Sequence, residues 1–340
     1  MPRAATIREL AKAAGLSASG VSYALRGNPR ISTDTVARVR QLAQELGYKP
    51  DLRVASLMAR IRSTRHSRDR ETLAFVWVST PLQKLLPPYH EHYLKTILAG
   101  ARRRADQLGC TLAEFRLDEP GMTPSRLVQI LRTRGITGVV FSPAMLHLAV
   151  TIDWKWDEFA SAIIGNTEWS PALHRAGHHH YRSMWRTLER LRAEGFERPA
   201  AILSSGIQQR IHGVHQAAFQ VNHPAPAEAA ELTQFGVPED HTGLKAWPRR
   251  LAPDALIVGW PVDRATERTL RALVPTAKRM VTLDWQPAGA LPGIDVCNDE
   301  IAASAVDLVI AQLHRNERGV PVHPTSLLLD GVWREEAAER

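Results

Sequence analysis

Residues 71–340 alternate short apolar runs with segments of helical period, and this alternation constrains the fold more than any other feature. The apolar runs have the length of buried strands and cover 72–79, 110–117, 137–143, 161–167, 199–205, 254–259 and 279–284. The helical patterns cover 92–108, 124–134, 181–194, 210–220, 263–273 and 299–315. Short apolar strands separated by helices favour parallel, doubly wound sheets. The sequence therefore predicts an α/β body for this part of the chain.

The positive charge of the chain is concentrated in its first 70 residues. Residues 1–70 contain fourteen Lys and Arg against five Asp and Glu, an excess of nine, whereas the whole chain carries +8. The remaining 270 residues therefore have a net charge of −1. A basic head on a nearly neutral body indicates a polyanion-binding segment, although a solvated basic face is an alternative.

Within this basic head, the pattern predicts three short helices. Thr6 and Glu9 fit a capping box, Gly15 suits a helix end, and Ser17 can cap a second helix over 18–25. A third helix is expected over 33–46. A helix-turn-helix whose second helix enters the major groove explains its small, polar residues, and a plain three-helix bundle is the alternative.

The segments 6–32 and 36–50 resemble, without gaps, the headpiece of the transcriptional regulators of the lactose-repressor (LacI) and GalR type. The resemblance implies that Ala18, Ser19 and Tyr23 read bases. It also implies that Ser17, Ser22, Arg8 and Arg30 contact phosphates. The expected DNA-contacting set is completed by Thr6, Asn28 and Ala55. Gly20 replaces the usual Thr of the family, and Ala18 has no hydrogen-bonding side chain, so the operator sequence stays open.

The resemblance continues into a hinge. Leu57 falls at the position where family members wedge a Leu from each protomer into the minor groove, and the alternative is an ordinary linker helix. The connector at 60–70 is longer and richer in Arg than usual, which fits either added phosphate contacts or a flexible tether. We expect a headpiece at 1–50, a hinge and linker at 51–70, and a body at 71–340.

For the body, the resemblance implies the two-lobed fold of periplasmic binding proteins, with chain crossings near 168–175, 296–300 and 327–331. The effector would lie between the lobes, at the carboxyl ends of the strands. The expected effector contacts are Tyr89, His92, Tyr93, Asn166, Arg210, Trp260 and Asp284. The usual Asp-Asn stretch is replaced by Ala-Gly-His-His-His at 176–180, which indicates an aromatic, His-rich pocket.

Other classes of protein find little support. We expect no metal, because the runs at 178–180 and 90–92 cannot direct three adjacent ligands at one ion. No phosphate-binding loop or hydrolase elbow occurs, so we expect no cofactor and no catalytic residues. Two cysteines, the lack of an apolar leader and the lack of a membrane-length apolar run predict a cytoplasmic protein without membrane contact.

The sequence thus predicts an all-α helix-turn-helix headpiece on a two-lobed α/β body. The expected function is that of a DNA-binding transcriptional regulator, a repressor, which acts as a homodimer on a pseudo-palindromic double-stranded DNA operator. A small molecule, with carbohydrate as one option, would modulate its affinity for DNA. The alternatives are a cytosolic sugar-binding or sugar-modifying protein with a basic localising head, and a DNA-architectural protein without an effector.

Overall fold

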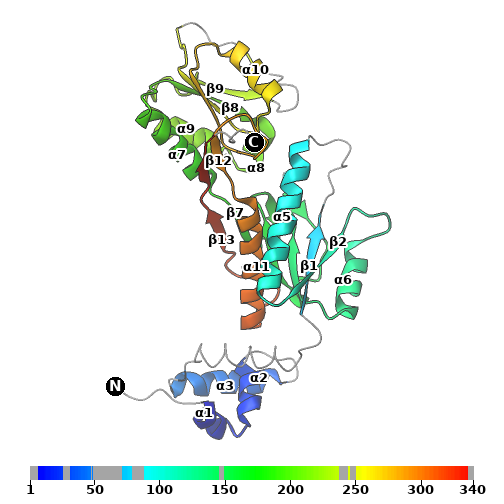
Figure 1. The fold of residues 1–340 in the computed structure, drawn as a ribbon. Coiled ribbons are helices and arrows are strands. Elements are labelled where there is room, and N and C mark those ends of the chain that lie inside the picture. Colours follow the sequence, from blue (N-terminus) through cyan, green and yellow to red (C-terminus); the bar gives the residue numbers. More distant parts are fainter. Residues whose placement is uncertain are drawn as a thin grey trace. The chain divides into compact units, whose positions relative to one another are not determined.

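The computed structural model describes residues 7–25, 31–46, 48, 71–78, 88–144, 149–236, 244–245 and 250–335 (Figure 1). The chain divides into two compact units. One contains the three N-terminal helices and the segment 310–318, and the other contains residues 72–309 and 319–340.

The N-terminal unit contains α1 (Ile7–Ala14), α2 (Ala18–Leu25) and α3 (Thr33–Glu45). Gly15 ends α1 in the left-handed region, with φ of 66°. The hydroxyl oxygen of Ser17 accepts a hydrogen bond from the backbone N–H of Gly20 at 3.0 Å, which caps α2. Leu10, Val21 and Val39 are fully buried at the centre of the three helices. The three predicted helices are confirmed.

The first sheet of the larger unit is six-stranded, in the order β13-β7-β5-β3-β1-β2, and its pairings are all parallel. Its strands are β1 (Thr72–Trp77), β2 (Thr111–Arg116), β3 (Gly138–Phe141), β5 (Ala160–Ile164), β7 (His174–His178) and β13 (Ser326–Leu329). The buried faces of β1 and β3 pack into an apolar core with Phe141, Trp154 and Trp169.

The second sheet has the order β14-β12-β11-β10-β8-β9 and is parallel except where β14 pairs with β12. Its strands are β8 (Pro199–Ser204), β9 (Thr233–Gly236), β10 (Ala255–Val258), β11 (Arg279–Thr282), β12 (Gly293–Asp295) and β14 (Val332–Arg334). A separate two-stranded ribbon pairs β4 (Ala149–Thr151) with β6 (Glu168–Ser170). The two parallel sheets confirm the predicted α/β architecture.

The other helices are α5 (Pro88–Gln107), α6 (Pro124–Thr133), α7 (His180–Ala193), α8 (Ser205–Arg210), α9 (Val214–Asn222), α10 (Arg264–Leu273) and α11 (Asn298–Arg315), with a 3₁₀ turn at Trp156–Glu158. Helices α5 and α11 lie side by side (Figure 1). Arg103 donates to the carboxylate of Asp299 at 3.0 Å. A Cβ at Gly100 would lie 2.2 Å from the backbone oxygen of Asp299, so this contact requires glycine.

The structure differs from the sequence expectation in two local features. The chain passes from the first sheet to the second between β7 and α7, at 178–180, rather than near 168–175. The reason is that His174–His178 pair with β5 and extend the first sheet. The helix expected over 210–220 is split, because His212 and Gly213 both have positive φ, and α9 begins only at Val214. The later passages lie between β12 and α11 and between β13 and β14.

Candidate functional site

The second helix of the N-terminal unit carries the exposed side chain that the sequence analysis assigned to base reading. Tyr23 is 47% exposed on α2, while Val21 and Ala24 on the same helix are fully buried. Ser17 is exposed at the start of α2 and uses its hydroxyl as a cap. Helix α2 therefore buries one face and presents Tyr23 on another, as a recognition helix must.

Most of the expected DNA contacts fall outside what the structure describes. Thr6, Asn28, Arg30, Ala55 and Leu57 lie outside the described residues. The backbones of Arg8, Ala18, Ser19 and Ser22 belong to α1 and α2, but their side chains are outside the described part. These assignments stay predictions.

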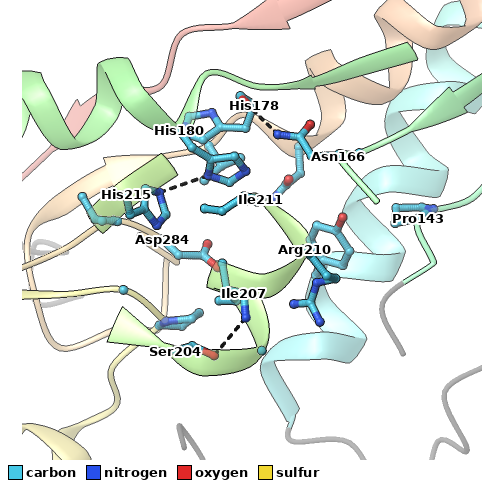
Figure 2. Close-up of a pocket in the computed structure, with 18 of the residues that line it drawn as sticks. Pro143, Asn166, His178, His180, Ser204, Ile207, Arg210, Ile211, His215 and Asp284 are labelled. Atoms are coloured by element: carbon cyan, nitrogen blue, oxygen red, sulfur yellow. Dashed lines mark hydrogen bonds between the residues drawn. The ribbon is translucent and has the colours of Figure 1, made fainter. Parts of the chain in front are cut away.

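The larger unit contains a cavity of about 400 Å³. Its walls come from residues that follow the carboxyl ends of strands in both sheets, such as Asn166 after β5 and Asp284 after β11. Helices α5, α8 and α9 supply Tyr93, Arg210 and His215. Figure 2 labels Arg210 and His215 among the lining residues. In doubly wound folds, the carboxyl ends of parallel strands form the ligand-binding edge, and this cavity has the volume of a small-molecule site.

Four of the residues predicted to contact an effector line this cavity: Tyr93, Asn166, Arg210 and Asp284. The side-chain amide of Asn166 donates to the carbonyl of His178 at 3.2 Å. A Cβ at Gly177 would lie 1.9 Å from Oδ1 of Asn166, so glycine at 177 makes room for this amide. The backbone N–H of Asp284 donates to the hydroxyl of Thr282 at 3.1 Å, which positions the start of the Asp284 loop.

Burial changes the acid–base chemistry of the cavity. Desolvation, with a smaller contribution from Asp295, raises the pKa of Asp284 to about 7. Burial also raises the pKa of Tyr93, with Asp284 adding to the effect and Arg210 opposing it. Near neutral pH, Asp284 can therefore either donate or accept a proton in a hydrogen bond with a ligand, while Tyr93 keeps its hydroxyl proton.

Three histidines share one wall of the cavity. The rings of His178 and His180 meet edge to face with centroids 4.9 Å apart, and those of His180 and His215 with centroids 4.8 Å apart. Burial lowers the pKa of His178 to about 4 and that of His215 to about 3, and it lowers the pKa of His180 well below 6.5. All three imidazoles are therefore neutral at physiological pH.

Two of the expected effector residues lie elsewhere. Trp260 is 1% exposed and packs in the core of the second sheet, whereas its neighbours Gly259 and Pro261 line the cavity. His92 is exposed on α5 and does not line the cavity. It precedes Tyr93 and so lies roughly 100° around the helix. Tyr89 belongs to α5, but its side chain is outside the described part.

Sequence reasoning missed His215 and Gln208, but it expected the run at 178–180 to make the pocket rich in histidine. The replacement of the family's Asp-Asn stretch by histidines was a usable signal for His178 and His180. No local pattern marks His215, because its contact with His180 joins positions 35 residues apart.

Among the residues that the structure places, no group of three or more His, Cys, Asp or Glu can hold a metal ion. Within the same ranges, no helix has the length and apolar content needed to cross a membrane.

Comparison with known proteins agrees with the resemblance. The family of bacterial regulatory proteins, lacI family, matches residues 6–51. The regulator AscG of Escherichia coli K12 is 35% identical over 104 residues, which are 31% of this chain and 26% of AscG. The regulator MalR of Streptococcus pneumoniae TIGR4 is 43% identical over 54 residues, 16% of each chain. The matched segments thus span about a quarter or less of these two relatives.

Solved structures show the same fold at low identity. A complex of the transcriptional regulator CelR with cellobiose has a TM-score of 0.50 at 17% identity, covering 98% of this chain and 100% of CelR. A periplasmic binding protein/LacI transcriptional regulator from Alkaliphilus metalliredigens, complexed with D-xylulofuranose, has a TM-score of 0.51 at 14% identity, covering 79% and 100%. Residues 6–51 therefore match the lacI family of bacterial regulatory proteins, and the chain shares its fold with the CelR and Alkaliphilus structures.

Proposed function

We propose that this protein is a DNA-binding transcriptional regulator, a repressor, whose affinity for its operator is modulated by a small molecule. The observation that carries the proposal is the combination of a lacI-family helix-turn-helix with an α/β unit that holds a cavity of about 400 Å³. A dimer would present two copies of α2 to a pseudo-palindromic double-stranded operator.

The effector class that we propose is carbohydrate. The cavity combines apolar walls such as Ile97 and Ile207 with the polar groups of Arg210 and Asp284. A sugar offers hydroxyls that accept from Arg210 and exchange hydrogen bonds with Asp284. Sugars are also the ligands named for CelR and for the Alkaliphilus regulator. Binding in the cavity would be coupled to DNA affinity, which is an allosteric relation between two sites.

The alternative of a sugar-modifying enzyme has weaker support. Hydrolysis of a glycosidic bond commonly uses two carboxyl groups that flank the bond. Asp284 is the single carboxylate among the described residues that line the cavity. The proposal is therefore a binding role without catalysis.

Selection of bound duplexes from a random pool tests the DNA-binding part. We expect the full chain to enrich a symmetric motif, and Tyr23→Ala to change or weaken it. Tyr23 is exposed, so its replacement leaves the core of the N-terminal unit intact. Gln44→Ala, at another exposed position, is the matched control. Leu57→Ala tests the hinge assignment and should weaken binding to the motif. A chain that binds all duplexes alike would support the basic localising head instead.

Thermal shift with cellobiose, D-xylulose and a panel of monosaccharides and disaccharides tests the effector part. A sugar that binds the folded state raises the melting temperature. Arg210→Ala should abolish that rise, whereas Arg264→Ala, at a position with a 68% exposed side chain outside the cavity, should keep it. If no sugar shifts the transition while DNA selection succeeds, the architectural alternative gains support over the regulator.

A further inference from the structure

A hydrogen-bonded chain of three side chains leads from the start of α9 to the wall of the cavity. We call it the imidazole chain, and it consists of Gln208, His215 and His180. Nε2 of Gln208 lies 3.2 Å from Nδ1 of His215. Nε2 of His215 lies 3.1 Å from Nδ1 of His180, and Figure 2 marks this second contact with a dashed line. Gln208 and His215 are buried, and His180 lines the cavity. The proposed function does not by itself require such a chain.

The backbone of α9 sets the direction of the hydrogen bonds in the imidazole chain. The backbone N–H of Gln216 donates to Oε1 of Gln208 at 3.3 Å. Gln216 lies in the first turn of α9, where backbone N–H groups have no acceptor within the helix, and Gly213 before it offers no side-chain cap. Because a backbone N–H can only donate, the amide oxygen of Gln208 must face Gln216. The amide nitrogen of Gln208 is therefore the atom that faces His215.

This orientation determines the proton position on both rings. An amide nitrogen donates, so Nδ1 of His215 accepts and its proton lies on Nε2. Nε2 of His215 then donates to Nδ1 of His180, which leaves the proton of His180 on Nε2. Burial lowers the pKa of both rings, so each carries one proton near neutral pH and the direction is unambiguous.

The last N–H of the chain points to open space. Among the described residues, none forms a hydrogen bond with Nε2 of His180, and this nitrogen is not one of the fully enclosed polar atoms that lack a partner. His180 lines the cavity, so its Nε2–H is available to a bound molecule. The ring is held on its other side by His215 and by the edge-to-face contact with His178.

We infer that His180 is a specificity-determining residue of the effector site, a neutral N–H donor that requires an oxygen acceptor on the ligand, and that Gln208 is the positioning residue that sets this polarity through His215. The inference rests on the proposed function and deepens it by naming the chemistry of one ligand position. A hydroxyl, carbonyl or carboxylate oxygen satisfies His180. An ammonium or amide N–H at the same place meets a donor and leaves two buried donors unpaired.

Gln208→Glu should reverse the donor and acceptor roles along the imidazole chain. A carboxylate at 208 still accepts from the N–H of Gln216, but it can only accept from His215. The proton of His215 then moves to Nδ1, that of His180 also moves to Nδ1, and Nε2 of His180 becomes an acceptor. The matched control is Gln209→Glu, which adds the same charge on the same helix at an exposed position.

The test is the tautomer of each ring, measured on the full chain without any ligand. Long-range proton–nitrogen correlation spectra of protein labelled with ¹⁵N-histidine distinguish the protonated from the bare ring nitrogen, and His180→Gln and His215→Gln assign the two signals. We expect the Nε2–H tautomer for both rings in the wild type and in Gln209→Glu. We expect the Nδ1–H tautomer for both in Gln208→Glu.

Gln208→Met keeps the length of the side chain and removes its polarity, so it covers the case in which Gln208→Glu fails to fold. Both rings should then lose their single tautomer and show a mixture. A His180 that carries its proton on Nδ1 or is doubly protonated in the wild type at pH 7 would overturn the inference. So would a tautomer unchanged in both Gln208→Glu and Gln208→Met. These spectra involve no DNA, so their failure is distinguishable from a failure of the proposed function, which duplex selection measures.

Discussion

Replacement of Leu10 by alanine should unfold the N-terminal unit and leave the larger unit folded. Leu10 is fully buried and is the largest buried side chain in the core formed by α1, α2 and α3, where Ala11, Ala14 and Ala24 provide much of the remainder. Truncation of a fully buried leucine to alanine costs roughly 3 to 5 kcal/mol. A domain of this size seldom has more than about 3 to 5 kcal/mol of stability. The loss is thus comparable with the entire stability of the unit.

The distribution of tryptophan allows both units to be measured in one protein. All 9 tryptophans lie between Trp77 and Trp333, so tryptophan fluorescence reports on the larger unit alone. Hydrogen exchange with mass spectrometry reports on α1, α2 and α3. In Leu10→Ala we expect the amides of these helices to lose protection, while the urea midpoint of the fluorescence transition stays at the wild-type value.

Gln44→Ala is the control, because Gln44 is exposed on α3 and its truncation removes no buried surface. It should keep wild-type protection in all three helices. Wild-type protection in Leu10→Ala would show that the small core does not determine the stability of this unit. A fluorescence midpoint that falls together with the protection would contradict the independence of the two units.

Three further predictions concern the larger unit. Gly100→Ala places a Cβ against the backbone of Asp299 and should lower the free energy of unfolding by about 1 to 3 kcal/mol in urea titrations; an unchanged value would contradict the required close approach of α5 and α11. Asp284 has a pKa of about 7 in the folded state against about 4 when unfolded, so its burial makes stability fall as pH rises between these values. Asp284→Asn should therefore melt higher than the wild type at pH 8, and the difference should disappear near pH 4; equal melting temperatures at pH 8 would refute the raised pKa. His178 has a pKa of about 4 against 6.5, so it stays neutral when folded and takes up a proton when unfolded, and stability is lost as pH falls from 6.5 to 4. His178→Gln should flatten the dependence of melting temperature on pH between 4 and 6.5. An unchanged slope would argue against the lowered pKa of His178.

Much of the architecture could be predicted because its signals are local. Helix α2 begins where a Ser can cap it, and α1 ends where Gly15 can adopt positive φ, and each of these requirements concerns a few neighbouring residues. Strands such as β1 and β10 are short, largely apolar runs, and this composition reflects burial on both faces of a parallel sheet. The strand at His174–His178 was missed because it contains polar and charged residues and forms by pairing with β5 and β13.

The candidate site could be predicted from the sequence less fully than the architecture. Tyr93, Arg210 and Asp284 could be placed in the cavity because each sits beside a strand end or in a family motif that the sequence displays. Trp260 was expected in the cavity because it follows the end of β10. A residue at such a place can face either the cavity or the core, and Trp260 packs in the core.

By itself, the sequence determined the basic three-helix head, the alternation that builds the two sheets, and the edge of those sheets at which the cavity lies. These properties depend on charge, period and capping, which act over a few residues. The tertiary structure alone decided which side chains meet in the cavity and which way their protons point. The contact of His215 with His180 and the amide orientation of Gln208 depend on how α7, α8 and α9 are brought together by the fold, and no short-range pattern encodes that geometry.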